Sequence, residues 1–326
     1  MSHRKETLII QTAFLGDCVL TLPLINTLKN CPSTGRVSVI CRPEFRAVFK
    51  SCPQADEVIS FDKNGKDKGL GGTLRLVKKI KRKNFNRVFL PQRSFRSGFI
   101  AAAARIPERI GFKRGGASLF LTSRTNYDWS VHEVERLLNL AEAAGCSDKK
   151  REYCLMPDKD LAENYSRDFK RDDRKVVGIA PQSVWPTKRW PAQRYRELID
   201  SIKDRAQIVI FGSQKEEWPQ EAVNLTSRTS IKELIAAISQ IDLLVSNDSG
   251  VMHIAAALGK TAVVIFGATV PELGFAPYGS QTTIIEKDLD CRPCGLHGPK
   301  RCPRGHFKCM KDIKVETVRE AVLGKL

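Results

Sequence analysis

Two successive series of short apolar stretches, each alternating with helix-period stretches, constrain the fold of this chain most strongly. The first series predicts buried strands at residues 7–12, 37–41, 57–61 and 87–91. Its helices are predicted at residues 17–28, 43–50, 70–83, 95–104 and 131–144. The second series predicts strands at residues 176–180, 207–211, 222–225, 243–246, 261–266 and 282–286, with helices at 192–203, 231–239 and 251–258. Strand and helix in alternation predict an α/β fold of parallel sheets covered by helices on both faces.

A length of 326 residues fits two such domains. Residues 148–175 are highly charged and are typical of a crossover between domains. We therefore expect an N-terminal Rossmann-like domain over residues 1–160 and a C-terminal one over residues 175–326. Two doubly wound domains in sequence predict a ligand site in the cleft between them, beyond the carboxyl ends of the strands.

The net charge of +18 is concentrated in the first half of the chain. Residues 1–160 carry 29 of the 54 Lys and Arg residues and 16 of the 36 Asp and Glu residues, a net charge of +13. Such asymmetry indicates an acidic partner, which is a nucleic acid, an anionic membrane surface or a phosphorylated substrate.

We expect a cytoplasmic protein. No run of about 18 apolar residues predicts a transmembrane helix, and Gly16 and Asp17 interrupt the N-terminal apolar stretch that resembles a signal peptide. Six of the ten cysteines are scattered, which is typical of reduced thiols in a cytosolic protein: Cys18, Cys31, Cys41, Cys52, Cys146 and Cys154.

Residues 246–259, SNDSGVMHIAAALG, predict a turn from a buried strand into a helix. Asn247, Asp248, Ser249 and Gly250 favour helix capping and close approach of a backbone. The free N–H groups and positive dipole of such a turn favour an anion, and His253 adds a side-chain donor one turn later. The alternative is an ordinary capped helix with a surface histidine.

Three stretches in this order resemble glycosyltransferase family nine, the bacterial lipopolysaccharide heptosyltransferases. They are AFLGDCVLTLP at residues 13–23, APQSVWPTKRWP at 180–191 and NDSGVMHIAAALG at 247–259. Two further stretches are most similar to the heptosyltransferase II branch: residues 90–112 and the cysteine-rich residues 291–310. The resemblance covers essentially the whole chain.

The resemblance implies a GT-B fold, with ADP-heptose bound to the C-terminal domain and the growing core oligosaccharide bound to the N-terminal domain. It also implies transfer of heptose, with inversion at the anomeric carbon, onto a heptose already attached to Kdo-lipid A. This acceptor is built on a lipid of the anionic inner membrane, so we expect the enzyme to bind that membrane surface as a peripheral protein. No cofactor is implied.

Asp17 is the expected catalytic base, because it follows the first strand and matches the Gly-Asp of the family. A carboxylate there can take the proton of the acceptor hydroxyl, which is typically worth about 10²–10⁴ in rate. The alternative is an N-cap of the following helix.

The donor site is expected from the family motifs. Lys188 would stabilise the negative charge of the departing ADP; its alternative is a solvated loop lysine. Asp248 would cap the helix or contact the heptose hydroxyls, and Glu216, or its neighbour Glu217, would hold the ribose. Thr229 would meet adenine through its backbone. The expected diphosphate contacts are Ser183, Lys188, Ser249, Gly250 and His253.

Arg93 and Arg96 follow the strand at residues 87–91. A guanidinium pairs well with a phosphate or with the Kdo carboxylate, so both are expected on the acceptor side. Surface solubility is their alternative.

Cys291, Cys294, Cys302 and Cys309, together with His297 and His306, supply the side chains of a zinc site. The spacing of the later cysteines matches no standard zinc finger, so reduced or structural cysteines are favoured over zinc.

Two other classes of protein remain open from the residues. A sugar-nucleotide epimerase shares the two-domain architecture. A basic nucleic-acid-binding protein with a Cys/His module fits the charge, but the basic residues are not interleaved with stacking aromatics.

Overall fold

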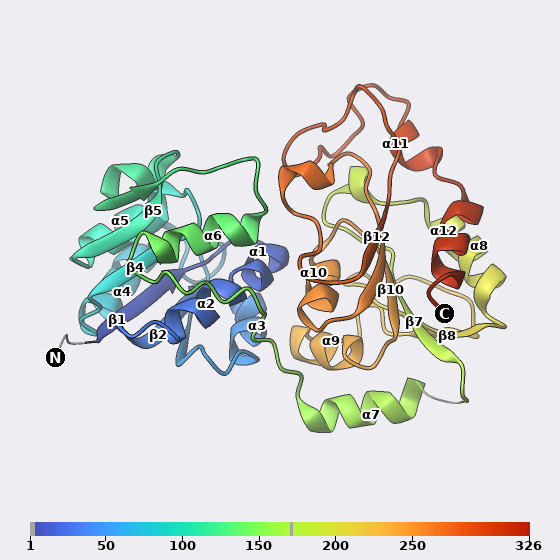
Figure 1. The fold of residues 1–326 in the computed structure, drawn as a ribbon, viewed down its shortest axis with the longest axis horizontal. Coiled ribbons are helices and arrows are strands. Elements are labelled where there is room, and N and C mark those ends of the chain that lie inside the picture. The colour runs from blue at the N-terminus through green and yellow to red at the C-terminus, as the bar shows by residue number, and fades with distance from the viewer. Residues whose placement is uncertain (1–3, 170–171) are drawn as a thin grey trace. The chain divides into compact units, whose positions relative to one another are not determined.

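The computed structural model describes residues 4–169 and 172–326, and the chain divides into two compact units, Met1–Met156 and Pro157–Leu326. Each unit is built on its own six-stranded sheet (Figure 1). Every pairing between neighbouring strands is parallel. The predicted α/β class is therefore confirmed.

Unit 1 has strand order β3-β2-β1-β4-β5-β6. Its strands are β1 (Lys5–Ile10), β2 (Thr34–Cys41), β3 (Glu57–Ser60), β4 (Arg87–Leu90), β5 (Glu108–Phe112) and β6 (Ser123–Thr125). Its helices are α1 (Leu15–Leu20), α2 (Leu22–Lys29), α3 (Arg46–Lys50), α4 (Gly69–Lys81), α5 (Phe95–Ala103) and α6 (Glu133–Glu142), with short 3₁₀ turns η1 (Pro43–Phe45) and η2 (Gly116–Phe120).

Unit 2 repeats this topology, with strand order β12-β11-β10-β7-β8-β9. Its strands are β7 (Lys175–Ala180), β8 (Ala206–Ile210), β9 (Val223–Asn224), β10 (Leu243–Asn247), β11 (Thr261–Ile265) and β12 (Thr282–Ile285). Its helices are α7 (Lys159–Phe169), α8 (Ala192–Ile202), α9 (Ile231–Ile238), α10 (Gly250–Ala257), α11 (Lys308–Lys311) and α12 (Val315–Leu323), with 3₁₀ turns η3 (Pro186–Lys188) and η4 (Pro271–Leu273).

The central strands are buried on both faces, which explains their continuous apolar sequences. In unit 2 the residues of β10 and four of the five residues of β11 are buried. In each unit the chain winds outward in one direction and then in the other, so the order reverses between two central strands. Ligands of doubly wound sheets bind at this switch point, beyond the carboxyl ends of the strands. The switch points lie between β1 and β4 and between β7 and β10.

The helix predicted over residues 17–28 is two helices. Thr21 is the C-cap of α1 and the N-cap of α2. Pro23 lies in the first turn of α2, where its missing N–H costs nothing; inside one long helix it would break the hydrogen-bond ladder. The charged segment predicted as a crossover also contains a helix, α7, which packs against α9 within unit 2.

Four of the six scattered cysteines are not free thiols. Cys31 is bonded to Cys146, and Cys52 is bonded to Cys154, with Cα atoms 5.5 and 5.1 Å apart. Both disulfides join the C-terminal end of unit 1 to residues near its N-terminus. The expectation of reduced thiols is wrong for these four, because sequence separations of 115 and 102 residues hide their proximity.

Candidate active site

The switch point of unit 2 is organised by Asn247, the last residue of β10. Its side chain is fully buried. Asn247 Nδ2 donates to the Pro181 carbonyl at 2.6 Å, and Asn247 Oδ1 accepts from the backbone N–H of Trp190 at 3.0 Å. The amide therefore fixes both ends of the loop that follows β7 against the end of β10.

Lys188, in the η3 turn of this loop, forms a buried ion pair with Asp248. Lys188 Nζ lies 2.6 Å from Asp248 Oδ2, and the two side chains are only 11% and 7% exposed. Thr269 Oγ1 donates to the same carboxylate oxygen at 2.6 Å. Lys188 is thus not a solvated loop lysine: residues following three adjacent strands, β7, β10 and β11, hold it in place.

The N-terminus of α10 lies beside this pair. Ser183 Oγ donates to the Asp248 carbonyl at 3.3 Å, and Ser246 Oγ lies 3.2 Å from Ser249 Oγ. Within the part of the chain that the structure describes, no side chain caps this helix at Ser249. The prediction that Asp248 caps α10 is wrong, because its carboxylate bonds to Lys188 and Thr269 instead.

His253 lies within α10 and is 4% exposed, so it is a buried histidine rather than a surface one. The N–H groups in the first turn of α10 and the Lys188 ammonium are hydrogen-bond donors that carry partial or full positive charge, and both lie at the turn between β10 and α10. This arrangement suits a diphosphate.

The loop after β8 places Glu216 next to the loop after β7. Gln182 Nε2 donates to Glu216 Oε2 at 3.2 Å, and Arg196 lies 3.8 Å from Glu216 Oε1. Glu217 is exposed, so Glu216 is the better oriented of the two carboxylates. Thr229 precedes Ser230, which caps α9 in a capping box with Glu233.

The cysteine-rich residues 291–310 pack against the Lys188 loop. Thr187 Oγ1 donates to the Pro299 carbonyl at 2.6 Å, and a Cβ placed on Gly298 would lie 3.6 Å from Lys188 Cγ. Arg292 donates to the carbonyls of Gly267 and Thr269, the turn that carries the Thr269 hydroxyl. Residues 291–310 therefore lie alongside the loop that carries Lys188 and form one side of the candidate donor site.

The four clustered cysteines lie near one another but do not form a metal-binding set. Cys291 Sγ is 3.9 Å from His306 Nε2. Burial raises the pKa of Cys309 to about 11 and also raises that of Cys294. Over residues 4–169 and 172–326, no three His, Cys, Asp or Glu side chains are arranged to hold a metal ion. That the chemistry needs no metal stays a prediction.

The switch point of unit 1 gathers polar residues from the ends of four strands. The Thr12 N–H and hydroxyl, after β1, both donate to Gln92 Oε1, after β4, at 3.1 and 2.9 Å. Lys63, after β3, lies 3.5 Å from the Thr12 hydroxyl. Burial lowers the pKa of Lys63, and the charges of Arg42 and Arg96 lower it further. Glu44, which forms an ion pair with Arg42, acts in the opposite direction on the pKa of Lys63.

Asp17 lies in the first turn of α1 and is half-buried. Its Oδ2 accepts from the Phe14 N–H at 3.1 Å, so Asp17 caps the helix from its third position rather than as the N-cap. The role of the same carboxylate as the catalytic base stays a prediction.

Arg93 is oriented by two aromatic rings. Its guanidinium lies 4.5 Å from the ring centroid of Tyr127 and 5.6 Å from that of Trp129, which is cation–π geometry. Arg96, by contrast, is exposed at the start of α5. Of the two predicted acceptor residues, Arg93 is therefore the more rigidly held.

The ring of Tyr127 also belongs to a buried network with Glu133 and Arg136. Tyr127 donates its hydroxyl to Glu133 Oε2 at 2.5 Å, and Arg136 donates to the same oxygen at 3.0 Å. Burial raises the pKa of Glu133 to about 7, against the opposing effects of Tyr127 and Arg136; the charge of Asp17 adds to the increase. Glu133 is therefore an ionisable neighbour of Asp17.

The sequence reasoning missed these supporting residues. In unit 1 they are Thr12, Lys63, Gln92, Tyr127, Trp129, Glu133 and Arg136, and in unit 2 they are Thr269 and Arg292. Arg136 left one signal, because it occupies the core-facing stripe of α6 with Leu137 and Leu140, where a charged residue needs a buried partner.

The two Rossmann-like units have the GT-B fold of solved glycosyltransferases. A family 9 glycosyltransferase from Veillonella parvula has a TM-score of 0.84 at 21% identity, covering 99% of this chain and 97% of that one. The ADP-heptose lipopolysaccharide heptosyltransferase II of Escherichia coli has a TM-score of 0.80 at 24% identity, covering 98% of both chains.

The family follows from the sequence. The model of glycosyltransferase family 9 (heptosyltransferase) matches residues 73–301, and the chain belongs to this family. Lipopolysaccharide heptosyltransferase 2 of Salmonella typhimurium is similar to it, at 26% identity over 343 aligned residues that cover 97% of each protein. The chain is thus an enzyme of the heptosyltransferase type.

Proposed function

We propose that the enzyme transfers heptose from ADP-heptose, with inversion, onto the first heptose of the lipopolysaccharide inner core. The buried Lys188–Asp248–Thr269 cluster at the switch point of unit 2 is the main structural support. The substrate assignment is supported by whole-length similarity to lipopolysaccharide heptosyltransferase 2 of Salmonella typhimurium.

In the proposed reaction, an acceptor hydroxyl forms a bond to the anomeric carbon of heptose as the bond from that carbon to the diphosphate oxygen breaks. Asp17 takes the hydroxyl proton, and ADP leaves with the bonding electron pair. The hydroxyl is a poor nucleophile at neutral pH, so removal of its proton during bond formation lowers the barrier.

Lys188 stabilises the charge that develops on ADP. A fixed ammonium acts most strongly on charge that is present in the transition state. Ser183, Ser249, Gly250 and His253 complete the diphosphate contacts, with backbone N–H groups of α10 contributing most. Because Asp248 is anionic and holds Lys188, its role is to position that lysine.

The remaining donor and acceptor contacts follow the family motifs. Glu216 accepts hydrogen bonds from the ribose hydroxyls, and Thr229 meets adenine through its backbone. Arg93 and Arg96 bind phosphate or carboxylate groups of the acceptor. The contacts of the Arg93 guanidinium with the rings of Tyr127 and Trp129 support a fixed position for this side chain.

No helix that the structure describes is both long and apolar enough to cross a bilayer. The proposed acceptor is a lipid of the inner membrane, so the proposal locates the enzyme in the cytoplasm, bound peripherally to that membrane.

The test is an assay of the purified protein with ADP-heptose and two acceptors, one carrying a single core heptose and one carrying none. Transfer only to the heptose-bearing acceptor is expected. Transfer to the heptose-free acceptor would instead make the enzyme a heptosyltransferase I. Turnover of the donor without any acceptor would point to an epimerase.

A further inference from the structure

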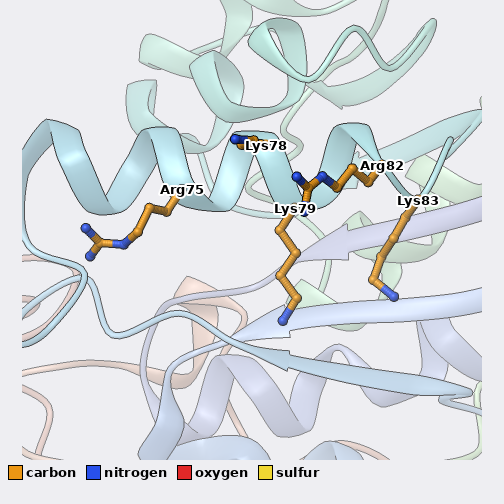
Figure 2. Close-up of a pocket in the computed structure, with 5 residues that line it drawn as sticks. All are labelled: Arg75, Lys78, Lys79, Arg82 and Lys83. Atoms are coloured by element: carbon orange, nitrogen blue, oxygen red, sulfur yellow. The ribbon is translucent and has the colours of Figure 1, made fainter.

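Helix α4 presents a basic face whose chemistry the transfer reaction does not use. Residues 69–83 contain six Lys and Arg residues and no Asp or Glu. Five of them, Arg75, Lys78, Lys79, Arg82 and Lys83, line one shallow hollow (Figure 2). A cluster of like charges on one helix is repulsive in isolation, so it favours contact with an anionic surface.

Neighbouring carboxylates neutralise only part of this hollow. Lys83 pairs with Glu57 at 2.8 Å and Arg75 with Asp67 at 3.3 Å. For Lys78, Lys79 and Arg82, no side-chain hydrogen bond or ion pair exists among the residues that the structure describes. Three cations are therefore available to a partner.

The same helix exposes two leucines. Leu70 is 76% exposed and Leu74 is 55% exposed. Positions 70, 74, 78 and 82 are spaced by four residues, so they form one continuous stripe along the surface of α4. The opposite face, with Leu76, Val77 and Ile80, is buried in unit 1. The stripe is apolar in its first two turns and cationic in its last two.

We infer that this exposed face of α4 is the surface with which unit 1 docks on an anionic phospholipid bilayer. Exposed leucines beside lysines and arginines are the features of an interfacial helix, whose apolar side chains enter the lipid while its cations meet the headgroups. Each Lys or Arg near such a surface strengthens binding roughly fivefold. The inference rests on the proposed function only in that the acceptor is a lipid.

A nucleic acid is a poorer match to this surface. Stacking on aromatic side chains accompanies the charge in proteins that bind single strands, and residues 69–83 contain no aromatic residue. Two exposed leucines have no use on a phosphate backbone. A bilayer accounts for both the leucines and the cations.

The test is co-sedimentation of the full-length protein with vesicles, in the absence of donor and acceptor. The vesicles contain phosphatidylcholine with phosphatidylglycerol, or phosphatidylcholine alone. Wild type is expected to bind the anionic vesicles preferentially and less tightly as salt rises. The triple variant Lys78→Gln, Lys79→Gln and Arg82→Gln is expected to bind roughly 100-fold more weakly.

Two further variants make the result specific. The control, Lys311→Gln, Lys314→Gln and Arg319→Gln, removes the same charge from exposed positions of unit 2 and is expected to bind like wild type. The double variant Leu70→Ser and Leu74→Ser retains the charge and is expected to bind at least about tenfold more weakly. All substituted positions are exposed, so folding should not change.

Equal binding by wild type and the α4 variants, or equal losses in the α4 and control triple variants, overturns the inference. So does tighter binding to a mixed-sequence RNA than to the anionic vesicles. An assay of heptose transfer to a deacylated, water-soluble acceptor tests the proposed function separately from membrane docking. The α4 variants should retain that activity, and failure of wild type in that assay would refute the transfer reaction while leaving the docking result intact.

Discussion

Replacing Lys188 by methionine removes one half of a buried ion pair, so its effects on stability and on catalysis must be separated. The carboxylate of Asp248 would keep the Thr269 hydroxyl but lose the cation 2.6 Å away. Breaking a buried pair from one side typically costs about 3–5 kcal/mol. Asp248→Asn should cost a similar amount, because it leaves the ammonium buried without its counter-charge.

The double variant Lys188→Met, Asp248→Asn removes both charges. Replacing a whole buried pair is often nearly neutral, so we expect the free energy of unfolding to recover to within about 1 kcal/mol of wild type. Transfer should not recover. Loss of one charge-stabilising group typically lowers kcat by about 10²–10³, and the double variant still lacks the ammonium.

Urea unfolding followed by tryptophan fluorescence measures the stability, since Trp185, Trp190 and Trp218 belong to unit 2 and only Trp129 belongs to unit 1. Steady-state transfer of heptose measures the rate. Recovery of turnover in the double variant would refute the reasoning, because Lys188 would then be needed only to neutralise Asp248. An unchanged unfolding midpoint in Lys188→Met would show that the pair is not buried in solution.

Three further outcomes are expected. Asp17→Asn should fold and bind donor nearly as wild type does, since asparagine can still accept the Phe14 N–H bond, yet turn over about 10²-fold more slowly; normal turnover would leave Asp17 as a helix cap only. Burial raises the pKa of Glu133 in the folded state to about 7, so the folded state binds this proton more tightly than the unfolded state does. Wild type should therefore lose stability relative to Glu133→Gln as pH rises from about 4.5 through 7. A pH-independent difference between the unfolding midpoints of the two proteins would contradict this. Reduction by dithiothreitol should lower the free energy of unfolding of unit 1 by about 2–5 kcal/mol per disulfide. Peptide mapping without reductant should find both disulfides, and free thiols at all four cysteines would exclude them.

The alternation of strands and helices was predictable because each central strand is buried on both faces. Runs such as residues 243–247 and 261–265 are buried on both faces, so they stand out from the helical stretches as short, largely apolar segments. Two strands of unit 1, β5 and β6, were not predicted. The strand β6, residues 123–125, contains Ser, Arg and Thr, and it pairs only because β5 lies beside it.

The motif residues of the donor site could be selected from the sequence, but their contacts could not. Asp248 looks like a helix cap from its position two residues before α10, and only the fold brings the Lys188 ammonium to it across 60 positions. Long-range pairs of this kind leave no local periodicity. The same holds for Gln92, which reads as a polar residue after a strand until Thr12 is seen to bond to it from 80 positions away.

The contacts of the Lys188 loop also determine when the donor site can first exist during synthesis. Thr187 and Trp190 bond to the carbonyls of Pro299 and Ile313, which are 112 and 123 residues later in the chain. Unit 1 ends at residue 156 and can fold as soon as it leaves the ribosome, because domains generally fold as units during translation. The turn that holds Lys188 must wait until the chain beyond residue 313 has emerged. A nascent or truncated chain that ends before this point contains every predicted donor residue but not the hydrogen bonds that place them, so donor binding should begin only after residue 313 has emerged from the ribosome.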